Sequence, residues 1–453
     1  MENGEIKLEE LAKEREDYLT SSKHKVLRHA LSQTKLSQVV RSDDKAAESD
    51  FIYSYNVKTL PVSNQKRSGR CWIFSASNLL REMIAKKTQM KMDDKIHNGN
   101  FEISQNYISF YDKLEKINYT LEGVISLLDE KPDDRKLMFL LQNGVGDGGQ
   151  WDMYVSIVKK YGICPKSAYK ENAQSDETKD SNAVINTSIK KFAYDAQKLY
   201  KESGDLNKVR VLKDEYMLKA YAFLVDCFGL PPTSFDFEYI SNDGGYKIER
   251  NLTPKSFFDK YIGSEIDEYV SIINAPTKDK EYYQTYNIEL LGNVIGGKKV
   301  THLNLPMERF KELVVKQLKA GELVWFGSDV SKFGNREEGV WDQAAFDYET
   351  PFDLELDFAK DGMLDYHDSM MNHAMVLTGF DEKDGKIIRW KIENSWGEAN
   401  GNKGFYQMSS AFFDHYVYQA AIKKEFLGKE ELEAIKKTAV LLPPWDPFGT
   451  LAD

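Results

Sequence analysis

Apolar residues recur at helical spacing directly after Cys71. In the segment 71–87 they fall every three or four positions, at Ile73, Ala76, Leu80 and Ile84. This is the period of a helix with one buried face. Gly69 stands just before the segment, and Ser68 offers a polar start. The pattern therefore predicts a partly buried helix with Cys71 in its first turn.

Two further helical patterns follow one another between residues 171 and 300. The first has apolar positions at Ile185, Ile189, Phe192, Ala196 and Leu199, and the second at Val209, Leu212, Tyr216, Ala220, Phe223 and Cys227. Gly204 supplies a stop for the first, and Gly229 with the pair Pro231-Pro232 ends the second. Two consecutive amphipathic helices with charged outer faces predict an inserted helical subdomain.

From about residue 321 the pattern favours β-strands, over 323–326, 374–380 and 387–394. In the last run Ile388, Trp390 and Ile392 alternate with charged residues, as in a half-buried strand. Residues 382–385 read as a tight turn after a strand that starts at His373. If the hairpin is symmetric about position 383.5, His373 and Asn394 face each other. The amide oxygen of Asn394 would then hold the imidazole.

The two ends of the chain differ from the middle. Residues 1–60 are polar and are expected to begin with a helix. The last 20 residues begin as a Lys/Glu-rich helix and end in LLPPWDPFGTLAD. Because this tail carries three prolines and a glycine, we expect an extended arm without regular structure.

Composition narrows the class of protein. The chain has 453 residues, 41% of them hydrophobic, with 61 basic and 72 acidic side chains and a net charge of −11. That charge argues against nucleic acid as a partner. No apolar run reaches the ~18 residues of a membrane-spanning helix, and the charged amino terminus does not resemble a signal peptide. Three cysteines are typical of a reducing compartment rather than of a disulfide framework. We expect a soluble cytoplasmic protein of several parts.

A histidine oriented by an amide needs a nucleophile, and Cys71 is the candidate. At a helix amino terminus the helix dipole favours its thiolate, as does an adjacent imidazolium. Gln65 lies six positions earlier, where its side-chain amide could join the Cys71 backbone N–H in an oxyanion hole.

These residues, in this order, resemble the papain-like cysteine peptidases. The local motifs agree as well: Trp72 follows the cysteine, and Asn394 opens the run Asn394-Ser395-Trp396-Gly397. The segment Gly148-Gly149-Gln150-Trp151 resembles that family's glycine-rich substrate segment. The cysteine that secreted members use for a nearby disulfide is missing here. His373 follows Cys71 by 302 residues (373 minus 71), whereas secreted members have about 130–150.

By these features the chain is identified as a member of the bleomycin hydrolase/aminopeptidase C branch. The resemblance runs from about Lys58 to the end and includes the closing Pro443-Pro444-Trp445-Asp446-Pro447. It implies an α+β papain-like fold with a helical half, a β-barrel-like half, a helical insertion and an arm at each end. It also implies a homohexameric ring with active sites facing an inner chamber.

The resemblance divides the chain into five parts. These are an amino-terminal hook over 1–57, the helical half with the nucleophile over 58–170, the insertion over 171–300, the β half with His373 and Asn394 over 301–430, and an arm in the active-site cleft over 431–453.

The expected activity is that of a cytosolic cysteine aminopeptidase acting through a thioester, with bleomycin-like amides and homocysteine thiolactone as further substrates. Cys71, His373, Asn394 and Gln65 would be catalytic, and Trp396 would shield the His–Asn hydrogen bond. The substrate would contact Gly148, Gly149, Ala452 and Asp453. The Asp453 carboxylate would pair with the substrate's α-amino group.

Peptides are the expected partners, with no membrane, no metal and no other cofactor. Two alternatives remain open: a papain-like endopeptidase whose tail does not gate the cleft, and a non-catalytic oligomeric scaffold.

Overall fold

The computed structural model of this chain describes residues 4, 6–42, 44, 50–93, 98 and 101–452. The chain separates into two compact units. One unit comprises residues 1–50 and 342–358, and the other comprises residues 51–341 and 359–453. Every residue proposed above for the site lies in the larger unit.

The smaller unit is helical. Its elements are α1 (Leu8–Thr20), α2 (Ser22–Leu31), α3 (Leu36–Val39), the 3₁₀ helix η3 (Gln343–Ala345) and α14 (Glu349–Phe352). Lys23 forms an ion pair with Asp353 at 2.6 Å, and the backbone N–H of Ser42 donates to the Ala345 carbonyl at 2.9 Å. These contacts join two segments that are about 300 positions apart in the sequence. The expected helix near the amino terminus is confirmed as α1.

Helices dominate the first part of the larger unit. They are α5 (Cys71–Lys87), α6 (Gln105–Ser126), α7 (Arg135–Asn143), α8 (Trp151–Tyr161), α9 (Ala173–Asp176), α10 (Lys179–Ser203) and α11 (Leu206–Phe228). The expected helix after Cys71 is confirmed as α5, which is buried along most of its length. Cys71 is its first residue, so the thiol stands at the helix amino terminus.

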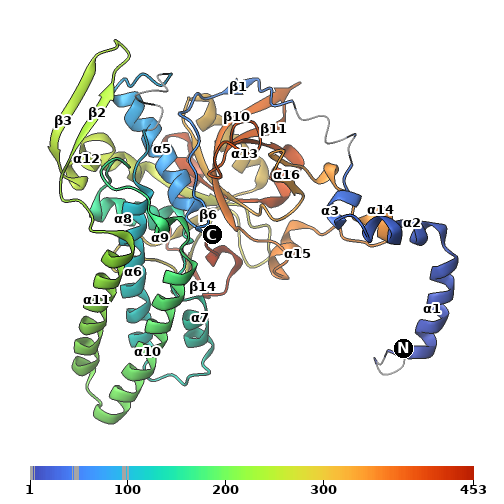
Figure 1. The fold of residues 1–453 in the computed structure, drawn as a ribbon, viewed down its shortest axis with the longest axis horizontal. Helices are drawn as coiled ribbons and strands as arrows, with labels where there is room; N and C mark the ends of the chain where they lie inside the picture. Colours follow the sequence, from blue (N-terminus) through green and yellow to red (C-terminus); the bar gives the residue numbers. More distant parts are fainter. Residues whose placement is uncertain are drawn as a thin grey trace. The chain divides into compact units, whose positions relative to one another are not determined.

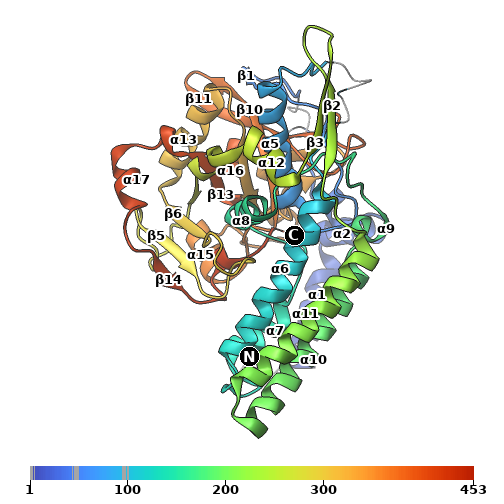
Figure 2. The ribbon, with the colours of Figure 1, turned by 90° about the vertical axis from the view of Figure 1, so that its left-hand side faces the viewer.

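Helices α6, α10 and α11 run side by side (Figures 1 and 2). Their shared core includes Phe110, Leu121, Ile185, Ile189, Phe192, Val209 and Leu224. Gly204 ends α10 in the left-handed conformation, at φ +63°, which glycine adopts without steric cost. Both helices predicted between 171 and 300 are confirmed.

A single sheet dominates the rest of the larger unit. Its strands are β1 (Tyr55–Asn56), β4 (Tyr269–Ile273), β5 (Thr285–Ile288), β6 (Thr301–Asn304), β7 (Val324–Ser328), β8 (Gly334–Asn335), β9 (Val340–Trp341), β10 (His373–Lys383), β11 (Lys386–Glu393), β12 (Phe405–Ser409), β13 (Val417–Lys423) and β14 (Val440–Leu442). The order is β14-β5-β6-β4-β13-β7-β10-β11-β12-β9-β8, with β1 beside β10. Thus β10, which begins at His373, lies between β7 and β11 inside the sheet.

The remaining elements of the larger unit pack around this sheet and the helices. They are the hairpin β2 (Phe235–Ile240) with β3 (Tyr246–Leu252), α12 (Pro254–Tyr261), η2 (Gly263–Glu268), α13 (Met307–Lys319), α15 (Lys360–Asp365), α16 (Ser410–Tyr416), η4 (Lys424–Phe426), α17 (Lys429–Ala434) and η5 (Pro447–Gly449). Of the helices in the described residues, none is both long enough and apolar enough to cross a membrane.

The hairpin β10–β11 is present, but its predicted register is wrong. Lys383 pairs with Lys386 across a turn made by Asp384 and Gly385, both at positive φ, as a two-residue hairpin turn requires. The turn is therefore centred at 384.5, and two further irregularities shift the pairing near Leu377 and Asp381. Local sequence does not reveal such bulges, so simple symmetry placed Asn394 opposite the wrong residue.

The polar face of β11 is also more buried than the alternation predicted. Arg389 and Glu393 are 8% and 1% exposed. Arg389 is satisfied by a bond to Asp381 at 3.0 Å, because a buried charge needs a partner. The strand is therefore buried on both faces near its carboxyl end, where the site lies.

The carboxy-terminal tail contains short regular elements, contrary to the expectation for it. Leu441 and Leu442 belong to β14, which pairs in parallel with β5, and residues 447–449 form η5. Phe448 is buried. Apolar side chains and backbone pairing with β5 therefore dock this proline-rich segment along the sheet.

Candidate active site

Cys71 is fully buried at the amino terminus of α5. The backbone N–H of Ala374, the residue after His373, donates to the Cys71 Sγ at 3.4 Å. The thiol therefore lies against the first residues of β10. The helix dipole and this N–H both stabilise negative charge on the sulfur.

His373 and Asn394 are joined side chain to side chain. The Nε2 of His373 lies 2.9 Å from the Oδ1 of Asn394, and the Ser395 backbone N–H donates to the same oxygen at 2.8 Å. The contact expected from the sequence is thus present, although the strand register differs. Because Nε2 faces the amide, Nδ1 is the ring nitrogen left for the thiol.

Trp396 covers this pair. Its ring packs against the His373 ring in a tilted arrangement, with centroids 4.8 Å apart and an angle of 33° between the ring planes. Burial lowers the pKa of His373 to about 4, the hydrogen bond to Asn394 opposes that shift, and the positive charge of Arg336 adds to it. An opposite charge close to the ring, such as a thiolate at Cys71, would favour the imidazolium.

Gln65 is buried and tied to the segment after Asn394. Its Oε1 accepts from the Ser395 hydroxyl at 2.6 Å, and its Nε2 donates to the Ser68 carbonyl at 2.7 Å. The Gln65 backbone N–H donates to the Ser395 carbonyl at 2.8 Å. These bonds fix the amide just ahead of the helix that carries Cys71.

The glycine pair lies beside Trp72. A Cβ on Gly149 would come within 2.4 Å of the Trp72 ring, so this position admits only glycine without rearrangement. The Trp72 indole N–H donates to the Asp147 carbonyl at 2.6 Å, and Lys116 donates to the Gly148 carbonyl at 2.6 Å. The backbone of the glycine segment is therefore held from both sides.

Asp147 is a site-positioning residue that sequence reasoning missed. Its carboxylate accepts from the Gly69 N–H at 3.0 Å and from Lys113 at 2.5 Å, and also from Thr178 and Asn182. Burial alone would raise the pKa of Asp147, but the Lys113 charge and these hydrogen bonds hold it well below its usual range. An aspartate before two glycines carries no signal of its own in the sequence, because Asp-Gly-Gly is a common turn.

Glu393 is a second residue that the sequence did not single out. Its Oε1 accepts from Arg81 at 2.9 Å and from Asn78 at 2.8 Å, both on α5. Asn78 also donates to the Ser63 hydroxyl at 3.0 Å. This buried cluster joins the three segments that carry Gln65, Cys71 and Asn394. Burial raises the pKa of Glu393 to about 7, although the Arg81 charge opposes the shift.

The carboxy-terminal arm reaches the glycine segment. Ala452 and Gly149 form an antiparallel bridge, with N–H to carbonyl distances of 3.2 and 3.3 Å. Gln150 donates to the Thr450 carbonyl at 2.6 Å, and Lys280 holds Asp446 at 2.9 Å. Asp453, the last expected substrate contact, lies outside the described residues.

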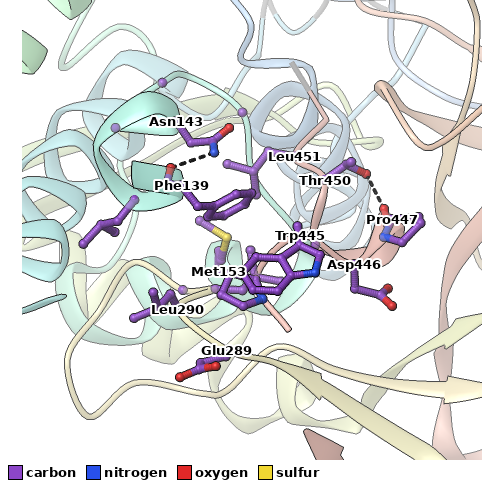
Figure 3. Close-up of a pocket in the computed structure, with 18 of the residues that line it drawn as sticks. Phe139, Asn143, Met153, Glu289, Leu290, Trp445, Asp446, Pro447, Thr450 and Leu451 are labelled. Atoms are coloured by element: carbon purple, nitrogen blue, oxygen red, sulfur yellow. Dashed lines mark hydrogen bonds between the residues drawn. The ribbon is translucent and has the colours of Figure 1, made fainter. Parts of the chain in front are cut away.

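A cavity of about 540 Å³ lies along the arm (Figure 3). Its apolar lining includes Phe139, Leu140, Met153, Leu290, Trp445 and Leu451. Arg135 lies 3.6 Å above the Trp445 ring, which anchors the arm at this point. Gly148 and Asn372, the neighbours in sequence of Gly149 and His373, also line the cavity.

Comparison with known proteins gives concordant matches. Residues 5–449 match the model of the Peptidase C1-like family. Aminopeptidase C from Streptococcus thermophilus is 42% identical over 96% of each chain, and aminopeptidase C from Lactobacillus helveticus is 40% identical over 99% of each. The crystal structure of PepW from Lactobacillus rhamnosis HN001 is 42% identical, covers 99% of this chain and 100% of its own, and superposes with a TM-score of 0.95. The predicted α+β papain-like fold is confirmed, and the chain belongs to the Peptidase C1-like family.

Proposed function

We propose that Cys71, His373, Asn394 and Gln65 are the catalytic residues of a cysteine aminopeptidase. Membership in the Peptidase C1-like family and the aminopeptidase C relatives make the chain a cysteine aminopeptidase. The contacts around Cys71 support the assignment of the residues that perform the reaction. The contacts at the end of the arm support a mechanism that confines cleavage to the first residue.

The chemistry is acyl transfer in two steps. The Cys71 thiolate adds to the first peptide carbonyl, and the oxyanion accepts hydrogen bonds from the Gln65 amide and the Cys71 N–H. His373 then gives its proton to the departing amine, which leaves a thioester on Cys71. Neutral His373 next takes a proton from water, the hydroxide attacks the thioester, and Cys71 is released as the thiolate.

Asn394 supports both steps by fixing the imidazole. Its Oδ1 lies 2.9 Å from Nε2, so Nδ1 stays directed to the thiol side throughout. An amide adds no second negative charge, unlike a carboxylate in the same place. Trp396, packed against the ring, keeps water from competing for this hydrogen bond.

The bridge between Ala452 and Gly149 is the observation that best supports confinement of cleavage to the first residue. Gly149 offers one N–H and one carbonyl on the side where residues before the scissile bond would pair, and the arm uses both. A longer peptide therefore has no backbone partner there, and only a chain whose amino end stops at this point fits. The carboxylate of Asp453 would meet the substrate's α-amino group.

The cavity beside the arm is our candidate for the side chain of the first residue. It borders Gly148 and Asn372, next to the segment that holds the substrate backbone and next to His373. Its apolar lining favours apolar side chains, since burial of such a group contributes about 1.5–3 kcal/mol. From the resemblance we further propose that the protein hydrolyses bleomycin-like amides, that it is cytoplasmic and that it forms a homohexamer.

Two reporter amides that differ only by an acetyl group on the α-amine test this function. Under reducing conditions, we expect turnover of the free-amine reporter alone, and its loss in Cys71→Ala. Turnover of both reporters would favour an endopeptidase whose tail does not gate the cleft. Turnover of neither, with no labelling of Cys71 by a thiol reagent, would favour a non-catalytic scaffold.

A further inference from the structure

Arg336 places a positive charge beside the reaction centre. Its guanidinium carbon lies 4.3 Å from the centroid of the Trp396 ring, and the centroid of the same ring lies 4.8 Å from that of the His373 ring. Arg336 itself is exposed to solvent. The Trp396 ring therefore contacts both the imidazole and an accessible cation.

The backbone around Arg336 is fixed although its side chain is exposed. The Tyr406 hydroxyl donates to the Arg336 carbonyl at 3.1 Å, and the Gly401 N–H donates to the Glu337 carbonyl at 2.9 Å. Asn335 caps the turn, because its Oδ1 accepts the backbone N–H groups of Glu337 and Glu338 at 3.1 and 3.2 Å. The loop therefore presents the guanidinium from a defined position.

The direction of a bound peptide follows from the proposed function, on which this inference rests. The arm ends at Gly149, where Ala452 pairs with it, so the substrate's amino end lies on that side. His373 protonates the amine that leaves, so the residue after the scissile bond must pass His373. Trp396 contacts the imidazole, and Arg336 contacts Trp396, so both lie close to the path of that residue.

We propose that Arg336 binds a carboxylate on the residue that follows the scissile bond. The carboxylate can come from an aspartate or glutamate side chain, or from the carboxyl terminus of a dipeptide. Guanidinium recognises carboxylate through charge and paired N–H donors. The cation–π contact with Trp396 holds the guanidinium beside the ring that packs against His373.

The electrostatics of the site support this role. The Arg336 charge acts at His373 in the direction that disfavours the imidazolium, although the proposed reaction needs that form. A substrate carboxylate next to Arg336 offsets its charge at the ring. The kcat/KM of acidic substrates should therefore be raised in two ways. The carboxylate contacts Arg336, and the imidazolium forms more easily.

The test compares four substrates that share an amino-terminal leucine. They are Leu-Asp-amide, Leu-Asn-amide, Leu-Gly with a terminal carboxylate, and Leu-Gly-amide. We expect kcat/KM for each carboxylate substrate to exceed that of its neutral partner by about two- to fivefold at low salt. Both ratios should fall toward one in Arg336→Gln and at high ionic strength, and Arg336→Lys should restore part of the preference.

Lys386→Gln is the matched control. It removes the same charge at the first residue of β11, which lies roughly 23 Å along the strand from Glu393 at about 3.3 Å per residue, and it should leave both ratios unchanged. Ratios near one in the wild-type protein would overturn the proposal, as would ratios that persist in Arg336→Gln. A preference confined to one pair would identify the source of the carboxylate. Turnover of the neutral amides reports separately on the aminopeptidase activity and on folding.

Discussion

Glu393 and Arg81 form a buried ion pair, at 2.9 Å, between the strand that leads into Asn394 and the helix that begins at Cys71. Arg81 also contacts Glu82 at 3.3 Å, so two carboxylates share one cation. Burial raises the pKa of both carboxylates, that of Glu393 to about 7. The cluster that aligns the site therefore also responds to pH.

This cluster predicts a pH-dependent loss of stability. Because the folded pKa of Glu393 lies above its ordinary value of 4.5, the folded state holds a proton that the unfolded state has lost. The Glu393 contribution to stability should therefore decline as pH rises from about 4.5 to about 7. Urea unfolding at pH 5 and pH 8 measures this change.

Glu393→Gln isolates the effect, since it keeps an acceptor for Asn78 and removes the titrating group. Relative to the variant, the wild-type protein should lose on the order of 1–3 kcal/mol between the two pH values. An equal change in both proteins would contradict the assignment of the proton to Glu393.

Asp147→Asn should impair both stability and turnover. The substitution leaves the buried Lys113 ammonium without its carboxylate, and breaking a buried pair costs about 3–5 kcal/mol. The Gly69 N–H also loses an ionised acceptor, so the loop ahead of Cys71 is held less firmly. Thermal unfolding and kcat under conditions where the variant stays folded check the two effects.

Asp195→Asn serves as the control for Asp147→Asn. Asp195 pairs with Lys191 at an exposed site, where such a pair contributes at most about 1 kcal/mol. If the two variants behaved alike, Asp147 would have no special part in the site.

Gly149→Ala should destabilise the segment that we propose holds the substrate backbone. Its methyl group would meet the Trp72 ring at 2.4 Å, and overpacking of this kind costs about 1–3 kcal/mol. Gly146→Ala, three residues earlier, places a methyl group in open space beside the cavity and should leave thermal stability unchanged. Comparing the thermal unfolding of the two variants separates the close approach at Gly149 from a general intolerance of alanine in this loop.

Phe139→Asp should weaken the preference for an apolar first residue. Phe139 lines the cavity beside the arm, and a carboxylate there penalises burial of a leucine side chain. We expect kcat/KM for amino-terminal leucine to fall about tenfold relative to amino-terminal lysine. Met138→Asp changes the adjacent exposed position of α7 and should leave the preference intact. Equal losses of kcat/KM in both variants would show that the cavity does not bind the first side chain.

Much of this site could be predicted because its signals are local. The helix after Cys71 follows from the spacing of its apolar residues, and the alternation around Trp390 indicates the strand that precedes Asn394. The register could not be predicted, since the irregularities near Leu377 and Asp381 depend on how the strands pack.

The supporting polar residues were missed for a related reason. Glu393 alternates like a solvent-facing residue, and its partner Arg81 lies 312 positions earlier. Asp147 and Arg336 likewise acquire their roles from segments far away in the chain. Contacts between residues so far apart produce no periodic pattern in the sequence. These partners can therefore be identified only in the folded structure.

We propose that the arm makes an aminopeptidase out of a papain-like site. A chain that ends at Thr450 lacks the Ala452–Gly149 bridge but keeps the buried Phe448 and the anchored Trp445. The most direct measurement is kcat/KM of this shortened chain for the acetylated and free-amine reporters. We expect the acetylated reporter to become a substrate and the advantage of the free amine to be lost. Continued resistance of the acetylated reporter, with unchanged turnover of the free amine, would contradict it.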